Sequence, residues 1–427
     1  MTDTATAPTE ERSGDDAKSL AAGGAALGVA MIIANAGNYL LNVFLGRWLT
    51  PAEFADANLM VTIMLLVTAA AISLQMIAAR FAGIYEVRED EAATAGMATW
   101  LSRYAWIGGG LLALVLVGGA SPLSQFFNSE SAWPFVILGL GMPCYLAQAV
   151  GRGVLQGKLT FRPLAATFIV EMLVRVVLGV ALVALGFGVV GATIGLTASF
   201  FATWLHVRIL IGGIEREAIT EDAVRAITRY AGPIVLLLIG QIIVNNGDVL
   251  IAKRFLEPET AGVYAAVALV GRAVFFLSWS VATTLFPAAA QRGERGQNAD
   301  GLLYGGLAVV AMMGVGFVVG AALLGGTVLG RVFGPEYADV SGPLAWYAFA
   351  TSLFAMANLI VSHHLSTGRT VEAFLLLVGG VGQTTALLLS RDSIDSLISA
   401  QVSSMSILFG VVLASHFIIG GTNDERV

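Results

Sequence analysis

From Asn38 to Pro51 the chain reads NYLLNVFLGRWLTP, and 207 positions later, from Asn245 to Pro258, it reads NNGDVLIAKRFLEP. An asparagine, an arginine, a leucine and a proline coincide at that offset, and four matches in fourteen positions are only a few more than chance would give. Both copies stand, however, at the exit of the first long apolar stretch of their half of the chain, where it gives way to a polar turn. This shared placement predicts two related halves.

The composition predicts a polytopic membrane protein. Hydrophobic residues make up 57% of the chain and charged residues 12%, and the mean hydropathy is +0.81. Soluble domains carry about 25% charged residues, so they are excluded as a class. The 50 glycines agree with a membrane protein, because glycine lets membrane helices approach one another closely.

Apolar runs between polar breaks predict an all-α protein with about twelve transmembrane helices. The predicted spans cover residues 20–45, 57–84, 99–119, 133–151, 163–185, 189–211, 230–253, 261–288, 302–330, 343–365, 370–390 and 394–419. The weakest divisions fall at residues 186–188 and 390–396, where only a tight turn separates two spans.

Lysine and arginine are divided unevenly between the two sides of this arrangement. With the amino terminus inside, sixteen fall on the cytoplasmic side and five on the outer side, and cytoplasmic loops are the ones that carry excess positive charge. We therefore expect a multi-pass protein of the cell (inner, cytoplasmic) membrane with both termini in the cytoplasm. Residues 1–19 are expected to be a disordered cytoplasmic tail, and residues 420–427 a second tail.

The longest connection, residues 212–229, separates six predicted spans from six. We expect an amino-terminal six-helix bundle at 20–211, a cytoplasmic linker at 212–229 and a carboxy-terminal six-helix bundle at 230–419. Each half has an even number of spans, so both copies enter the membrane from the same side. This predicts a parallel pseudo-two-fold about an axis along the membrane normal.

Three stretches carry a resemblance to a known family: LGRWLTPAEFA at 45–55, ARF at 79–81 and RFLEPETAGVY at 254–264. Because of these stretches, the chain resembles the polysaccharide-exporter branch of the multidrug/oligosaccharidyl-lipid/polysaccharide (MOP) superfamily. This branch includes the O-antigen type flippases. Ala55 stands where that family usually has glycine, a mild departure. The resemblance implies a MATE-like fold and, as substrate, an oligosaccharide linked to a polyprenyl diphosphate.

Arg272 is expected near the middle of its predicted span. It lies some eleven residues into 261–288, about 16 Å deep at 1.5 Å per residue. Placing an ionisable side chain at such a depth costs free energy, so a residue of this kind is first interpreted as functional. Two interpretations stay open: Arg272 binds a phosphate in a central cavity, or it is a structural partner for Asp248 or for backbone carbonyls.

Glu171 and Arg175 are expected to form a pair inside the span 163–185. Their i, i+4 spacing places them on one helix face. The pair is interpreted either as a structural lock or as a gate, which the anionic head of a substrate opens by competing for Arg175.

Asparagines gather at the outer part of the first span of each half. Asn38 and Asn42 share one face of the first, and Asn245 and Asn246 belong to the second. These amides either line a cleft and bind sugar hydroxyls or hydrogen-bond one helix to another.

Three further arginines lie near the ends of spans. Arg80 is expected to extend its charge toward the cytoplasmic interface, with capture of a phosphate there as the alternative. Arg47 and Arg254 of the repeated stretch are expected to fix the outer turns and to neutralise helix carbonyls.

Direct catalysis is not expected. The sequence contains no phosphate-binding P-loop, no nucleophile elbow and no His-Glu-x-x-His motif, so we expect no cofactor and no metal site. Cys144 is the single cysteine and is expected to be a packing residue. The net charge of −6, without a basic patch, gives no indication of nucleic acid as a partner.

The leading hypothesis is a flippase that moves a lipid-linked oligosaccharide from the inner to the outer leaflet by alternating access, within the lipid bilayer and with H⁺ or Na⁺ left open as a coupling ion. A multidrug extruder of the same superfamily is the alternative, although cationic drugs need buried carboxylates that the first four spans lack in their interiors. A glycan polymerase or ligase is a third hypothesis, although the predicted outer loops are short.

Overall fold

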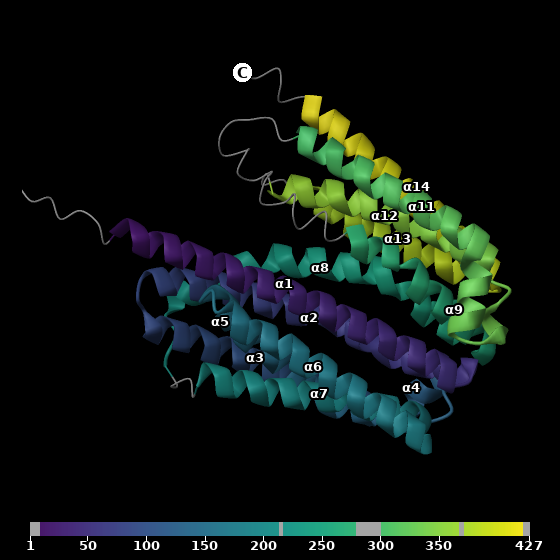
Figure 1. Cartoon of the computed structure of the whole chain (residues 1–427), viewed down its shortest axis with the longest axis horizontal. Helices are drawn as coiled ribbons and strands as arrows, with labels where there is room; N and C mark the ends of the chain where they lie inside the picture. The colour runs from purple at the N-terminus through teal and green to yellow at the C-terminus, as the bar shows by residue number, and fades with distance from the viewer. Residues whose placement is uncertain (1–8, 213–216, 279–299, 367–370, 422–427) are drawn as a thin grey trace, which may run out of the picture. The chain divides into compact units, whose positions relative to one another are not determined.

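The computed structural model describes residues 9–212, 217–278, 300–366 and 371–421, and throughout these ranges helices dominate the chain (Figure 1). Within them, nine helical segments are long and apolar enough to cross a membrane, α6 and α7 being counted as one. The prediction of an all-α polytopic membrane protein is confirmed.

Twelve of the helices overlap the twelve predicted spans, while residues 279–288 and residue 370 of those spans lie outside the described residues. In the first half they are α1 (Thr9–Trp48), α2 (Pro51–Val87), α3 (Glu91–Gly118), α5 (Trp133–Gly157), α6 (Phe161–Leu182) and α7 (Gly188–Ile211). In the second half they are α8 (Glu221–Phe255), α9 (Pro258–Gly271), α11 (Asp300–Val332), α12 (Ser341–Ser366), α13 (Val371–Leu389) and α14 (Ile394–Gly421). Short elements are α4 (Ala120–Phe126), the π-helical turn η1 (Val183–Phe187) and the 3₁₀ turn η2 (Pro335–Tyr337).

The chain forms two compact units. Unit 1 comprises Met1–Asn42, Ala70–Leu123 and Ser131–Ala231, and unit 2 comprises Val43–Ala69, Ser124–Glu130 and Gly232–Val427. The predicted bundles at 20–211 and 230–419 and the linker at 212–229 stay predictions. The same holds for the predicted tails: residues 1–8 and 422–427 lie outside the described ranges, and α1 begins at Thr9.

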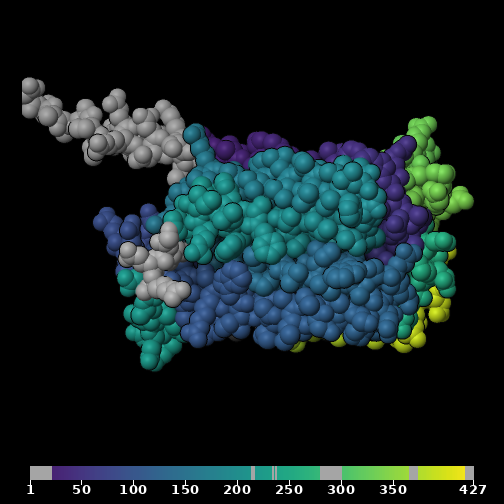
Figure 2. All heavy atoms as spheres, turned by 90° about the horizontal axis from the view of Figure 1, so that it is seen from below, coloured from purple at the N-terminus to yellow at the C-terminus, as the bar shows by residue number. Residues whose placement is uncertain are grey.

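In unit 1, α5 packs against α3 and α7, and α6 packs against α7. Figure 2 shows one face of this unit, where the blue side chains of α3 and α5 lie beside the teal side chains of α6 and α7. The backbones of α6 and α7 lie close together at Gly179 and Gly195, where a β-carbon on Gly195 would lie 2.5 Å from the Gly179 backbone. This contact places Arg175, one turn before Gly179, beside Ser199, one turn after Gly195.

The turn between α6 and α7 depends on two glycines. Gly186 and Gly188 have φ angles of 89° and 50°, which side-chain-bearing residues rarely adopt. The sequence placed its weakest division of spans at this point, and the structure confirms a tight reversal there.

In unit 2, α12 packs against α9, α11 and α14. Buried side chains of α11, α12 and α14 form one apolar cluster with Val244, Phe275 and Leu376, in which the rings of Phe275 and Phe354 stack with centroids 5.2 Å apart. Next to it, the absence of a side chain at Gly271 leaves room for the Tyr347 ring. Tyr347 thereby reaches Arg272.

Candidate functional site

A buried charge cluster joins α5 and α6 in unit 1. Glu171 lies between two arginines: its Oε2 is 2.7 Å from Arg152 Nη2, and its Oε1 is 2.5 Å from Arg175 Nη2. The predicted Glu171–Arg175 pair therefore forms, and Arg152 is added to it. We call these three residues the unit 1 cluster.

Neutral groups hold both arginines in place. Arg152 donates to the hydroxyl and the backbone carbonyl of Thr167, at 2.9 and 3.0 Å. Arg175 donates from Nη1 to the Asn38 side-chain oxygen at 3.1 Å and from Nε to the Ser199 hydroxyl at 3.4 Å. Of the predicted asparagines, Asn38 is thus brought to the cluster, and Asn42 donates to the Asn38 backbone carbonyl at 2.9 Å.

A second buried network surrounds Arg272 in unit 2. Arg272 Nη2 lies 2.6 Å from Asp248 Oδ1, and Arg272 also donates to the Asn246 side-chain oxygen and the Tyr347 hydroxyl. The other Asp248 oxygen accepts hydrogen bonds from Tyr264 and Tyr347, at 3.0 and 2.6 Å. The predicted residues Arg272, Asp248 and Asn246 meet here, whereas Asn245 is half-buried beside them in α8 without joining the hydrogen bonds just described.

The two units differ in the balance of their buried charges. In unit 2, Arg272 is paired with Asp248, and Lys253 is paired with Asp56 at 2.7 Å, so the described buried charges cancel. In unit 1, Arg152 and Arg175 share the single carboxylate of Glu171, which leaves one positive charge in excess. A buried charge without a full counter-charge attracts an ion of opposite sign, so the unit 1 cluster is the better anion site.

Arg80 takes part in neither of the two sets of contacts just described. Its side chain is exposed, and its guanidinium stacks 4.3 Å above the Tyr230 ring. The two interpretations of this arginine, an interfacial anchor or a phosphate contact, stay predictions.

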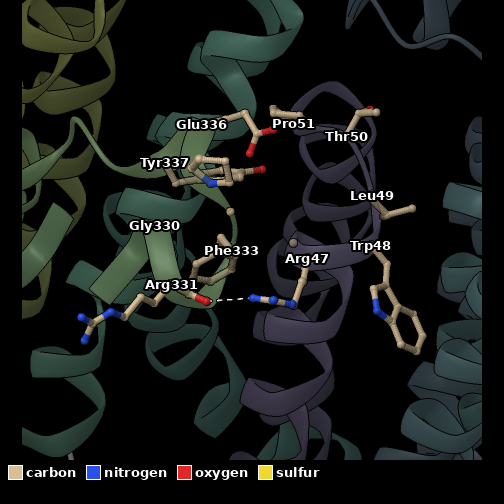
Figure 3. Close-up of a pocket in the computed structure, with 13 residues that line it drawn as sticks. Arg47, Trp48, Leu49, Thr50, Pro51, Gly330, Arg331, Phe333, Glu336 and Tyr337 are labelled. Atoms are coloured by element: carbon tan, nitrogen blue, oxygen red, sulfur yellow. Dashed lines mark hydrogen bonds between the residues drawn. The ribbon is translucent and has the colours of Figure 1, made fainter. Parts of the chain in front are cut away.

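A pocket of about 640 Å³ lies in unit 2 where the end of α1 meets the end of α11 and η2. Figure 3 shows Arg47 pointing toward the backbone carbonyl of Arg331, to which it donates a hydrogen bond of 2.8 Å, while the Arg331 and Trp48 side chains point away. Since one arginine is bound to a carbonyl and the other is turned outward, this pocket is a poor anion site. The bond of Arg47 agrees with its predicted role in fixing the turn.

Three charged or aromatic residues of the two networks were not predicted as site residues. The predicted fourth span ends at residue 151 and so leaves Arg152 on the cytoplasmic side, whereas α5 continues to Gly157 and buries this arginine. Tyr264 and Tyr347 were not predicted either, although Tyr264 precedes Arg272 by only eight residues, about two helical turns. Among the described residues, no group of three or more His, Cys, Asp or Glu side chains suits a metal ion.

Comparison with known proteins gives a family match and several relatives. The profile of the family described as "Polysaccharide biosynthesis protein" matches residues 44–342. The uncharacterized protein Rv1510 of Mycobacterium tuberculosis is 25% identical over 299 residues, 65% of this chain and 64% of the relative. The uncharacterized protein Mb3654 of Mycobacterium bovis is 26% identical over 268 residues, 58% of this chain and 59% of the relative. The matches thus span less than two thirds of the length of these relatives.

Solved structures share the fold. A multidrug resistance MATE family transporter of the MOP superfamily, in its inward-facing conformation, superposes with a TM-score of 0.77 at 14% identity, covering 94% of this chain and 99% of that one. A MOP superfamily transporter from Pyrococcus furiosus, described as having a binding pocket of reverse polarity, gives a TM-score of 0.65 at 15% identity, covering 91% and 94%. At these identities the likeness establishes the fold alone. The expected MATE-like fold is confirmed.

Proposed function

The chain belongs to the family of polysaccharide biosynthesis proteins, and from this premise we propose that it moves a lipid-linked oligosaccharide of the polyprenyl-diphosphate type from the inner to the outer leaflet of the cell membrane. It is a multi-pass membrane protein with the fold of MOP transporters. Its proposed location is the inner membrane, with both termini in the cytoplasm, and its proposed role is transport without catalysis.

The observation that carries this proposal is the excess positive charge of the unit 1 cluster. A diphosphate leaves water only if cations replace its hydration, and arginine is suited to bridging phosphate oxygens. Arg152 and Arg175 provide two such cations against one carboxylate. Asn38, which accepts a hydrogen bond from Arg175, supplies an amide beside this cation that can bind a sugar hydroxyl.

The same charge balance disfavours a multidrug extruder. A cationic drug needs a buried carboxylate that is not already neutralised, yet both buried aspartates of unit 2, Asp56 and Asp248, are paired with cations. The predicted role of Arg272 in phosphate binding stays a prediction, because its charge is compensated by Asp248. We therefore assign the anion to the unit 1 cluster.

Reconstitution tests this proposal. The full chain is placed in liposomes with a labelled polyprenyl-diphosphate-linked oligosaccharide on the inner leaflet, and a glycan-modifying enzyme is added outside. We expect the label to become accessible faster than in protein-free liposomes. Equal rates with and without protein would contradict the flippase function.

A matched pair of variants tests the site. Arg175→Gln is expected to slow transfer at least tenfold, because one of two phosphate-binding cations is lost. Arg225→Gln removes an exposed arginine of α8 that pairs with the exposed Glu221 and Asp222, and it is expected to transfer at the wild-type rate. Equal rates for the two variants would remove Arg175 from the site while leaving the function in place.

A further inference from the structure

Glu171 occupies the position that an incoming anion needs. Each of its two carboxylate oxygens binds a different arginine, at 2.7 Å to Arg152 and 2.5 Å to Arg175. A phosphate that bridges the two guanidinium groups would make the same two contacts. The carboxylate is therefore a built-in substitute for the anion while the site is empty.

The remaining contacts of the arginines leave little room for both anions at once. Arg152 is also committed to Thr167, and Arg175 to Asn38 and Ser199. An anionic headgroup must accordingly compete with Glu171 for the guanidinium groups. When it succeeds, the carboxylate loses at least one of its two cations in a buried setting, and a buried carboxylate without a cation favours its neutral, protonated form.

The charges of the complex point the same way. A polyprenyl-diphosphate-linked sugar carries two negative charges, one on each phosphate, and the two arginines carry two positive charges. With Glu171 ionised the complex would hold one excess negative charge in a medium of low dielectric constant, whereas with Glu171 neutral the charges cancel.

We propose that Glu171 takes up one proton from solution when a diphosphate headgroup binds to Arg152 and Arg175, so that substrate and proton bind together. This inference rests on the proposed function and names the coupling ion. The proton forms an O–H bond with the carboxylate, and nothing is oxidised or reduced.

The groups that face Glu171 fit a carboxyl that changes its charge. Helix α5 contributes Arg152, α6 contributes Arg175, and α1 and α7 contribute the neutral Asn38 and Ser199 through Arg175. One turn before Arg152 on the same face of α5, Gln148 is 1% exposed, and its Oε1 has no hydrogen-bond partner among the described residues. A protonated carboxyl or a sugar hydroxyl can donate a hydrogen bond to that oxygen.

Proton uptake then depends on the class of headgroup. A sugar linked through a single phosphate carries one negative charge, which the one excess positive charge of the cluster already balances with Glu171 ionised. We expect no proton to accompany it. The number of protons taken up therefore distinguishes a diphosphate-linked substrate from a monophosphate-linked one.

The experiment is calorimetry of the purified full chain in detergent, in two buffers with different ionisation enthalpies. The probes are a short-chain prenyl-diphosphate-linked monosaccharide and its monophosphate-linked counterpart. Wild-type protein is expected to take up about one proton with the first probe and none with the second, so its affinity for the first falls up to about tenfold per unit rise in pH. Glu171→Gln is expected to bind the diphosphate probe without proton uptake and with no such pH dependence.

The control is Glu221→Gln, which changes an exposed carboxylate of α8 to an amide and is expected to keep the uptake of one proton. Binding of the diphosphate probe to wild-type protein without proton uptake would overturn the role of Glu171 and leave the proposed function intact. Unchanged proton uptake in Glu171→Gln would overturn it as well. Failure of both probes to bind wild-type protein would contradict the proposed function itself, and the inference with it.

Discussion

Lys253 Nζ lies 2.7 Å from Asp56 Oδ1, and the two side chains are only 2% and 8% exposed. Lys253 belongs to the second copy of the repeated stretch, and Asp56 follows shortly after the first. Both lie in unit 2, where a β-carbon on Gly262 would collide with the carbonyl oxygen of Pro51. The chain around the end of the first copy is therefore packed against the chain around the end of the second, and the charge pair and the glycine lie at that contact.

Lys253→Met is expected to destabilise the protein by about 3–5 kcal/mol, because it leaves Asp56 buried without its cation. The double variant Lys253→Met/Asp56→Leu is expected to recover most of that loss, because it removes both charges. Thermal unfolding in detergent measures the difference. Lys158→Met, which breaks an exposed pair with Glu86, serves as control and is expected to cost about 0–1 kcal/mol. An equal loss in the single and double variants would show that the loss does not come from leaving Asp56 buried without its cation.

Gly262→Ala is expected to destabilise the protein by about 1–3 kcal/mol, because the added methyl group overlaps the Pro51 carbonyl and forces the two segments apart. Gly301→Ala in α11, where a β-carbon would meet nothing within 4 Å, is the matched control and is expected to be neutral or slightly stabilising. The midpoint of thermal unfolding checks both variants. Equal midpoints would mean that Gly262 does not form a tight contact.

Arg272→Met is expected mainly to lower stability, and Arg175→Gln mainly to weaken substrate binding. Arg272→Met leaves Asp248 buried without its cation and should cost about 3–5 kcal/mol of stability. Arg175→Gln leaves Glu171 paired with Arg152, so it should cost less stability while weakening binding of a diphosphate-linked lipid at least tenfold, or about 1.4 kcal/mol. Unfolding and binding assays on the same preparations check this. A binding defect confined to Arg272→Met would reverse the assignment of the two networks.

Tyr337 is expected to make the stability of the protein fall as the pH rises in the alkaline range. Burial, and then the neighbouring Glu336 carboxylate, raise the pKa of its hydroxyl above the ordinary value. A raised pKa means that the folded state keeps the proton while the unfolded state loses it above about pH 10, so stability falls by up to about 1.4 kcal/mol per pH unit there. Tyr337→Phe should lessen this fall and cost little at neutral pH, since the hydroxyl has no hydrogen-bond partner among the described residues. Unfolding midpoints at pH 8 and pH 11 test this: an equal drop in both proteins would exclude Tyr337 as its source.

Hydropathy predicted the helices well, because each span is an average over many residues. Helix spacing predicted the local pair Glu171–Arg175. The cost of a buried charge made the pairing of Arg272 with Asp248 one of two interpretations. Arg152 was not predicted as a buried site residue, because its burial depends on six helical residues beyond the apolar run, which hydropathy does not detect. Tyr347 was not predicted, because it reaches Arg272 through the space left by Gly271. That space depends on how α9 and α12 pack, which the sequence does not show.

The one uncompensated charge of the unit 1 cluster also has an electrical consequence. In the proposed transport cycle, a carrier that returns without cargo takes this positive charge back with it, whereas a carrier loaded with a diphosphate and a proton moves outward with no net charge at the site. An elementary charge that crosses the whole membrane field changes in energy by about 2.3 kcal/mol per 100 mV. A voltage that is negative inside the cell therefore acts on the empty step of the cycle, drawing the unoccupied site back toward the cytoplasm. In the proposed cycle, such a voltage is expected to speed the return of the empty carrier.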